Sequence, residues 1–236
     1  MADPDLHPSV LRTRRLLGRR AQVRHPAEYL LYAALGLAAG VVGVGFTRVL
    51  YLIEDLCDWA WRGPEWLRPA VGGLLLGGVL LVLPQMYGVG YPVLENAIGG
   101  RYVVGFLLLL LAGKIVATSL TIGIGGSGGV FAPSLFMGAM FGTAFGLLVQ
   151  HLGFAGPPGA YGLVGMGAVF AGAARAPITA VIIMFELTGE YSIILPLMLA
   201  IVLATLVSRV LSGDTIYTLK LRRRGIHLDA HTPVNP

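Results

Sequence analysis

A glycine-rich segment that ends in proline is the part of this sequence best suited to binding an ion. It reads Gly-Ile-Gly-Gly-Ser-Gly-Gly-Val-Phe-Ala-Pro over residues 123–133, and five of its first seven residues are glycine. So many glycines disfavour a helix interior, whereas proline is favoured in the first turn of a helix. We therefore expect a helix to begin near Phe131–Pro133, directly after an irregular glycine loop, and to run to about Val149.

The start of such a helix can bind an anion without any cationic side chain. The first N–H groups of a helix have no partner within it, and the helix dipole places about half a positive charge at that end. Glycine lets an ion approach the backbone closely because it carries no Cβ. Partial charges also hold an anion weakly enough to release it again, which suits a transport pathway.

The same segment permits a second interpretation, a nucleophilic serine. Residues 125–128, Gly-Gly-Ser-Gly, fit the Gly-x-Ser-Gly pattern of rhomboid intramembrane proteases, which need a histidine base within hydrogen-bond reach of the serine. The histidines of the chain are His7, His25, His151, His227 and His231. His151 alone falls near an apolar segment, about 30 Å of helix away from Ser127. The protease is therefore a remote alternative, and we expect no enzymatic activity.

The other chemistry-bearing residues imply no cofactor, metal or nucleic acid. The single cysteine, Cys57, excludes an intramolecular disulfide framework and a cysteine-based metal cluster. The net charge is +5, but the basic residues crowd the two ends of the chain. They are Arg12, Arg14, Arg15, Arg19, Arg20 and Arg24, then Lys220, Arg222, Arg223 and Arg224. Short basic flanks beside apolar spans favour anionic cytoplasmic headgroups, so we expect both ends in the cytoplasm.

The composition places much of the chain in a lipid bilayer. Hydrophobic residues make up 56% of the sequence and charged residues 12%, whereas a soluble domain carries about 25% charged residues. The 34 glycines lie inside apolar runs, a pattern typical of closely packed or broken transmembrane helices. The first residues lack the apolar core of a signal peptide. We expect a multi-pass protein of the plasma membrane.

The apolar runs predict an all-α protein with several spans. They cover 28–53, 69–83, 102–121, 131–149, 161–187 and 191–211, with the fifth interrupted at 173–177. Residues 54–68 contain three tryptophans and are expected at the membrane interface, and 87–96 is expected to form a turn-prone connection. Lys114 is expected to snorkel to the surface or to line a wet cavity.

Several short motifs follow one another in an order that resembles the CLC family of chloride channels and transporters. Residues 128–133, Gly-Gly-Val-Phe-Ala-Pro, are similar to the Gly-x-Phe-x-Pro motif of that family. Further similar segments are 134–139, 165–168, 174–179, 185–189, 193–198 and the pair 216–217. The resemblance covers about 29–224 and is weaker before residue 113. It implies transmembrane chloride transport.

The resemblance also implies which residues bind the ion. They are Gly128, Gly129, Val130, Phe131 and Tyr217, with Pro133 setting the helix start. The backbone N–H groups of Val130 and Phe131 would coordinate a dehydrated chloride, and the two glycines would permit that backbone geometry. The hydroxyl of Tyr217 would donate a hydrogen bond to the same ion from the cytoplasmic side.

Half of the family's pathway is missing from this sequence. The family's fold is an inverted repeat of broken and tilted helices that holds the ion between its halves. The Gly-Ser-Gly-Ile-Pro and Gly-Lys/Arg-Glu-Gly-Pro motifs of the first half occur nowhere in the chain. The chain therefore resembles the C-terminal half, with a basic cytoplasmic lead-in over 1–27, a transmembrane domain over 28–219 and a basic cytoplasmic tail over 220–236.

The resemblance further predicts partners. A complementary N-terminal half would complete the pore, and the family's dimeric assembly predicts a homodimer that associates through residues 179–204. Because half of the pore is absent, a non-transporting membrane subunit or a remnant of a CLC protein is the alternative. The motifs that distinguish a channel from a proton-coupled exchanger belong to the missing half.

Overall fold

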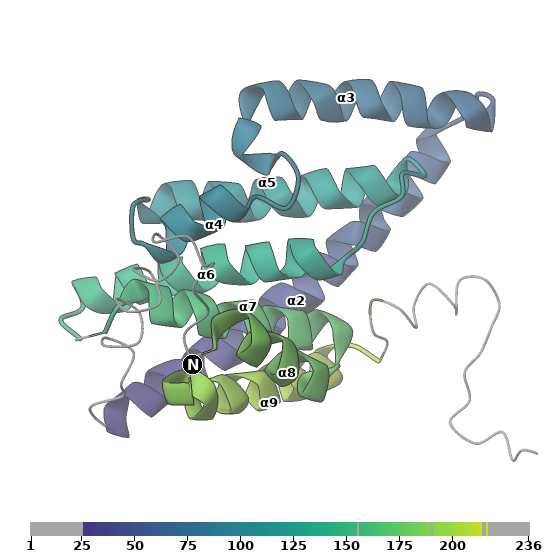
Figure 1. Cartoon of the computed structure of the whole chain (residues 1–236). Helices are drawn as coiled ribbons and strands as arrows, with labels where there is room; N and C mark the ends of the chain where they lie inside the picture. Colours follow the sequence, from purple (N-terminus) through teal and green to yellow (C-terminus); the bar gives the residue numbers. More distant parts are fainter. Residues whose placement is uncertain (1–25, 155, 190, 214–215, 217–236) are drawn as a thin grey trace, which may run out of the picture.

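A computed structural model describes residues 26–154, 156–189, 191–213 and 216 (Figure 1). The helices, in chain order, are α2 (Pro26–Ala60), α3 (Arg68–Val82), α4 (Tyr91–Ile98), α5 (Val104–Gly123), α6 (Phe131–His151), α7 (Pro158–Ala174), α8 (Pro177–Thr188) and α9 (Ile194–Leu211). Short 3-10 turns occupy Glu65–Leu67, Pro84–Met86 and Tyr191–Ile193. These described residues contain no strand, which confirms the all-α prediction.

Four helical stretches are long and apolar enough to cross a membrane, judged by length and composition. They are Glu28–Ala60, Val104–Gly123, Phe131–His151 and Tyr191–Leu211. Three shorter apolar helices, α3, α7 and α8, accompany them. Figure 1 shows α2 running obliquely across the other helices and α3 standing apart at one end. The expectation of broken and tilted membrane helices is confirmed.

Two connections differ from the sequence prediction. Helix α2 continues to Ala60, so the first part of the expected interfacial stretch 54–68 is the end of a long helix. Helix α4 occupies Tyr91–Ile98, where a turn-prone connection was predicted. Gly90 has φ +76° and Pro92 lies in the first turn, so these turn-forming residues start a short helix.

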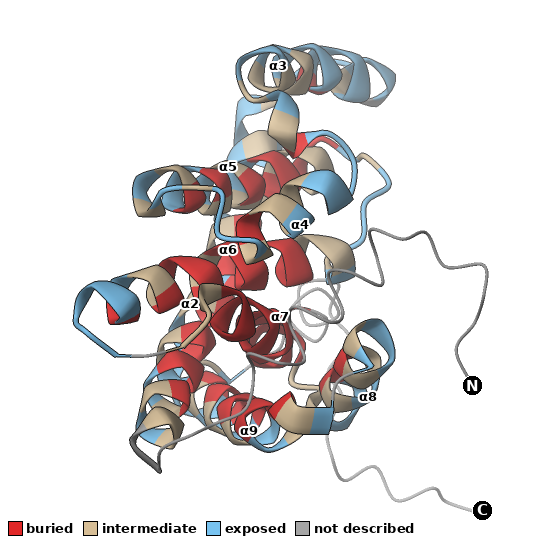
Figure 2. Ribbon diagram, turned by 60° about the vertical axis from the view of Figure 1, so that its left-hand side comes forward, coloured by how far each residue is buried: buried red, intermediate tan, exposed pale blue. Residues whose placement is uncertain are grey.

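Helix α7 is the centre of the structure. Every residue from Gly159 to Ala174 is buried, and Figure 2 shows buried residues concentrated in α6 and α7. A helix that is apolar on all sides must be enclosed by other helices. By contrast, Gly72 is the one buried residue among those of α3.

Glycines allow α6 and α7 to approach backbone to backbone. A Cβ atom on Gly138 would lie 2.4 Å from the carbonyl oxygen of Gly165, and one on Gly142 would lie 2.1 Å from that of Tyr161. Gly138, Gly142 and Gly146 are spaced four residues apart and therefore share one face of α6. The contact confirms the expected role of the glycines in close helix packing.

Glycines also allow α2 to pack closely against two other helices. A Cβ atom on Gly36 would lie 2.7 Å from the Cα of Ala200, and one on Gly40 would lie 2.8 Å from the carbonyl oxygen of Ala204, both on α9. One turn further, a Cβ atom on Gly43 would lie 2.8 Å from the backbone nitrogen of Ala173 on α7. Helix α2 thus holds α7 and α9 together.

Of the two alternatives expected for Lys114, snorkelling to the surface is wrong. Its side chain lies inside the protein with 5% of the residue exposed. The ammonium donates to the carbonyl oxygens of Gly88, at 2.7 Å, and Met86, at 3.2 Å, and lies 5.0 Å from the centre of the Phe136 ring. The charge is held by carbonyl groups of an irregular connection, which it fastens to α5 and α6.

We predict that Gly142→Ala lowers the free energy of unfolding by about 1–3 kcal/mol, because the added methyl group forces α6 and α7 apart. Thermal or denaturant unfolding in detergent micelles measures this change. Gly77→Ala in α3 is the matched control, since a Cβ there meets no atom within 4 Å. It is expected to leave stability unchanged or to raise it by up to about 1 kcal/mol. Equal effects of the two substitutions would contradict the packing argument.

Candidate anion site at the start of α6

A turn at two glycines ends α5 and precedes the loop that leads to α6. Gly125 has φ +86°. Its N–H bonds to the carbonyl oxygen of Ile122 at 3.0 Å, and the N–H of Gly126 bonds to that of Thr121 at 2.9 Å. This pair of bonds is a Schellman motif, which closes the C-terminal end of a helix. The exposed residues 127–129 then lead into α6, which begins at Phe131 as the sequence predicts.

The start of α6 has backbone donors available for a ligand. Within the described part of the chain, no backbone carbonyl accepts a bond from the N–H groups of Val130, Phe131 or Ala132, and no side chain caps the helix. The hydroxyl of Ser134 instead donates to the carbonyl oxygen of Phe131 at 2.7 Å. The positive end of the helix dipole is therefore unneutralised by these residues.

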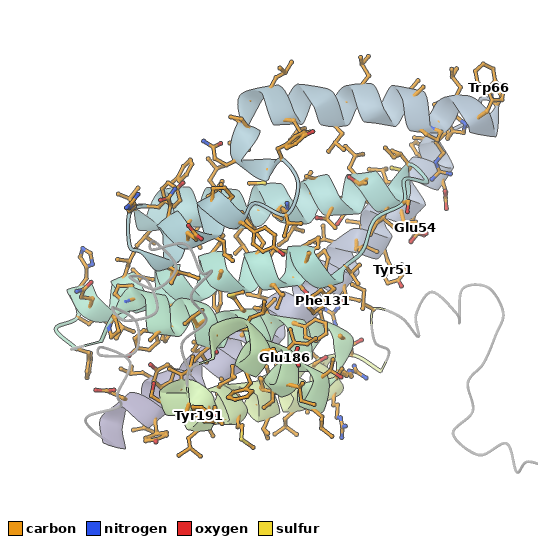
Figure 3. The ribbon with its side chains drawn as sticks, in the orientation of Figure 1. Tyr51, Glu54, Trp66, Phe131, Glu186 and Tyr191 are labelled. Atoms are coloured by element: carbon orange, nitrogen blue, oxygen red, sulfur yellow. The ribbon has the colours of Figure 1, made fainter. Side chains whose placement is uncertain are left out.

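Helix α7 connects the start of α6 to the end of the described chain. The ring of Phe131 packs edge-on against that of Phe170, with 5.1 Å between their centres. Ala173 lies one turn after Phe170 on the same face of α7, and its carbonyl oxygen accepts the N–H of Ile216 at 3.3 Å. Figure 3 shows Phe131 at the end of α6 that α2 crosses, with Tyr51 on α2 nearby in this view.

Ile216 is held from a second side by α2. The hydroxyl of Tyr51 donates to the carbonyl oxygen of Ile216, and both residues are buried. Tyr217, the predicted hydroxyl ligand, follows directly in the sequence but lies outside the described residues. Gly128, Gly129, Val130, Phe131 and Pro133 are neighbours in sequence around the start of α6, and the structure fixes the residue that precedes Tyr217.

The predicted break between α7 and α8 is present, and an arginine occupies it. Helix α7 ends at Ala174 and α8 begins at Pro177. Arg175, between them, has φ +53° and is the one non-glycine residue with positive φ in the described chain. This left-handed conformation costs about 1–2 kcal/mol for a residue with a Cβ atom.

The side chain of Arg175 binds the C-terminal end of α9. Its guanidinium donates to Ser208 Oγ at 3.1 Å and to the carbonyl oxygens of Ser208 at 2.9 Å, Ser212 at 2.5 Å and Gly213 at 3.0 Å. From α2, Arg48 donates to the carbonyl oxygen of Leu211 at 2.8 Å. Arg48 therefore supplies a donor for the carbonyl of Leu211, the last residue of α9, and Arg175 supplies donors for the carbonyls of Ser208, Ser212 and Gly213.

The alternative of an intramembrane protease lacks its base in the described chain. Ser127 precedes α6, and His151 is the last of its 21 residues, so about 30 Å of helix separates them. His151 Nδ1 lies 2.8 Å from the carbonyl oxygen of Leu147. The other four histidines lie outside the described residues. No group of three metal-ligating side chains occurs in the described ranges.

The comparison with known families decides the ancestry. The sequence profile of the family described as voltage gated chloride channel matches residues 8–209. This chain belongs to that family. The match covers most of the sequence, including the glycine loop, α6 and the break between α7 and α8, so the resemblance to CLC proteins is confirmed.

Curated relatives from this CLC family are H(+)/Cl(−) exchange transporters named ClcA. The chain is 36% identical over 199 residues to that of Vibrio campbellii and 37% identical over 201 residues to that of Vibrio parahaemolyticus. Each match covers 82% of this chain but only 42% of the relative. The chain therefore spans less than half the length of the curated relatives it matches. Their names describe transporters, not enzymes.

Solved CLC structures share the fold. A slow cyanobacterial Cl−/H+ antiporter superimposes with a TM-score of 0.72 at 29% identity, over 86% of this chain and 48% of that one. A eukaryotic CLC transporter superimposes with a TM-score of 0.69 at 29% identity, over 86% of this chain and 36% of that one. A CLC-type fluoride/proton antiporter shares the fold at 23% identity, with a TM-score of 0.69 over 84% of this chain and 47% of that one.

Arg48 and Tyr51 bind the carbonyl oxygens of Leu211 and Ile216, and neither residue is predicted from the sequence. One signal was present. Both polar residues lie inside the apolar run predicted over 28–53, and a charged residue within a membrane span marks a functional or structural contact. The partner of Arg48, Leu211, however, lies 163 residues away in the sequence, and this contact is known only from the fold.

We predict that Tyr51→Phe lowers the free energy of unfolding by about 1–3 kcal/mol, because the buried carbonyl of Ile216 loses its hydroxyl donor. Tyr87→Phe provides the control, since Tyr87 is 78% exposed, and should change stability by less than about 0.5 kcal/mol. Differential scanning fluorimetry in detergent compares the two. A Tyr51→Phe protein as stable as the control would remove the argument that this bond secures Ile216.

Proposed function

We propose that this chain supplies one half of a CLC-type chloride pathway, corresponding to the C-terminal half of the transmembrane domain. In this proposal the N–H groups of Val130 and Phe131 and the hydroxyl of Tyr217 coordinate a dehydrated chloride ion. Gly128 and Gly129 let the ion approach the backbone. The observation that supports it most is the uncapped start of α6 together with its contact to the end of α7, which also binds Ile216.

The proposed ligands favour anions and allow their release. All of them are N–H or O–H donors, so they interact favourably with an anion and unfavourably with a cation. The helix dipole adds about half a positive charge without a full cation that would trap the ion. The relatives named as H(+)/Cl(−) exchangers support chloride as the transported ion.

The proposal includes the partners that complete the pathway. A complementary N-terminal half would supply the remaining ligands, in keeping with the 42% of the relatives' length that this chain matches. Residues 179–204 would form a homodimer contact, since Ile182, Leu195 and Val202 are each more than half exposed. The protein would lie in the plasma membrane with the basic ends, 1–27 and 220–236, in the cytoplasm.

We predict chloride efflux from chloride-loaded liposomes that contain this chain together with a complementary N-terminal half. Liposomes with the chain alone are expected to release no chloride, because half of the ion's ligands are then absent. A chloride electrode measures the flux in both preparations. A folded chain that gives no efflux in either case would favour the alternative, a non-transporting subunit or remnant of a CLC protein.

A pair of substitutions at Val130 tests the backbone ligand. We predict that Val130→Pro, which removes the N–H, weakens chloride binding by at least about tenfold, since a hydrogen bond to a charged group contributes about 1.5–3 kcal/mol. Val130→Ala keeps the N–H and is expected to bind chloride as the unmodified protein does. Isothermal titration calorimetry measures both. Identical losses in the two variants would place the effect in the side chain and contradict the proposed ligand.

The same preparation tests ion selectivity. We predict a chloride flux that exceeds the potassium flux through the assembled pathway, because the proposed site contains donors and no carboxylate. Reversal potentials in asymmetric potassium chloride across a planar bilayer report the ratio if the flux is conductive. Ion-selective electrodes report it for coupled exchange. A potassium flux larger than the chloride flux would contradict the proposed site.

A further inference from the structure

The chain between α9 and the proposed chloride site is attached to the protein at three consecutive places. Arg48 of α2 binds the carbonyl oxygen of Leu211. Arg175 binds those of Ser212 and Gly213. Ile216 is then held by α2 and α7, through the hydroxyl of Tyr51 and the carbonyl of Ala173. Tyr217 is the next residue in the sequence.

Arg175 stands out among these attachments because its backbone conformation does not suit an arginine. Its φ of +53° ends α7 in the left-handed region, where glycine is the favoured residue. Gly189 ends α8 in the same way, with φ +61°. An arginine at such a position is explained by what its side chain does. The guanidinium reaches one hydroxyl and three carbonyl groups at the end of α9.

The position of Arg175 also links the two parts of the proposed site. Its backbone N–H bonds to the carbonyl oxygen of Ala171 at 2.8 Å, so it belongs to the last turn of α7. That end of α7 contacts Phe131 through Phe170 and Ile216 through Ala173. The helix that places the start of α6 therefore also carries the arginine that holds the chain leading to Tyr217.

We propose that Arg175 is a positioning residue for the chloride site. Its guanidinium fastens Ser208, Ser212 and Gly213 to the end of α7, and this attachment is needed for Tyr217 to serve as the proposed hydroxyl ligand. Arg175 acts through Tyr217 and does not itself touch the ion. This inference rests on the proposed function for its effect on chloride, but the attachment itself can be tested without chloride.

Arg175→Gly is the informative substitution because it separates the side chain from the backbone. Glycine adopts positive φ without strain, so α7 keeps its C-terminal turn while the side-chain hydrogen bonds to Ser208, Ser212 and Gly213 are lost. Arg175→Lys keeps a charge and fewer donors, and is expected to restore part of the function. Arg101→Gly is the matched control, since Arg101 is exposed and its guanidinium bonds to Asn96 Oδ1, five residues away in the sequence.

The first measurement follows the mobility of the chain at position 217. Cys57→Ser removes the native thiol, Tyr217→Cys introduces a site for a nitroxide spin label, and electron paramagnetic resonance reports the motion of the label in the reconstituted protein. Arg175→Gly is expected to narrow the spectrum, which indicates a mobile label, whereas Arg101→Gly is expected to leave it unchanged. An unchanged spectrum in Arg175→Gly would overturn the proposed attachment, whatever the outcome for chloride.

The second measurement is a double-mutant cycle on chloride affinity, in the preparation that transports chloride. Tyr217→Phe is expected to weaken binding by roughly tenfold, and Arg175→Gly by roughly three- to tenfold. If Arg175 acts through the hydroxyl of Tyr217, its substitution in the Tyr217→Phe background should cost less than about twofold further. Arg175→Lys should recover part of the loss.

The outcomes separate this inference from the proposed function. No effect of Tyr217→Phe or Val130→Pro on chloride binding would contradict the proposed site and, with it, the role of Arg175 in chloride binding. Clear effects of those variants with full affinity in Arg175→Gly would overturn the positioning role alone. If the loss of chloride affinity in the double variant equals the product of the losses in Arg175→Gly and Tyr217→Phe, Arg175 acts on the fold in general. That result would also overturn the positioning role.

Discussion

The backbone contact between α6 and α7 is the constraint on which the rest of the structure depends. Carbonyl oxygens of one helix lie where Cβ atoms of the other would stand, at 2.1 to 2.4 Å, so no side chain larger than hydrogen fits at Gly138, Gly142 or Gly165. The approach buries α7 on all sides and fixes its end against the start of α6. In a bilayer, where the hydrophobic effect gives helices little reason to associate, such close packing is a main source of stability.

The breaks in the helices follow a second constraint, because backbone polar groups in a membrane need partners within the protein. At each of these breaks, different groups supply hydrogen bonds to the exposed backbone. Gly125 and Gly126 turn back onto α5, Lys114 binds the carbonyls at residues 86 and 88, and Arg175 binds the end of α9. The first N–H groups of α6 find no carbonyl among the described residues, and neither do those of Val104 and Gly105 at the start of α5. The glycine loop over residues 125–129 sets the start of α6 apart, because it lets an ion approach the backbone closely, and makes it the candidate site.

Much of the fold could be predicted from the sequence because its signals are local. The apolar runs predict most of the helices. Helix α6 begins at Phe131, between a glycine run and Pro133, and α8 begins at Pro177, after an alanine-rich stretch. Gly90 and Pro92 show the limit of that reasoning, since turn residues also begin short helices. Lys114 shows another limit. Its burial depends on carbonyl groups 26 and 28 residues away, which a single-span pattern does not reveal.

The sequence by itself determined the family, the membrane character and the residues proposed to bind the anion, because each rests on composition or on a contiguous motif. Only the tertiary structure decided how those residues are brought together. Phe170 and Ala173 lie on one face of α7 and join segments from α6 and beyond α9, and Arg48 and Tyr51 reach the same region from α2. Contacts across more than 160 residues depend on how the helices pack, which no local pattern specifies.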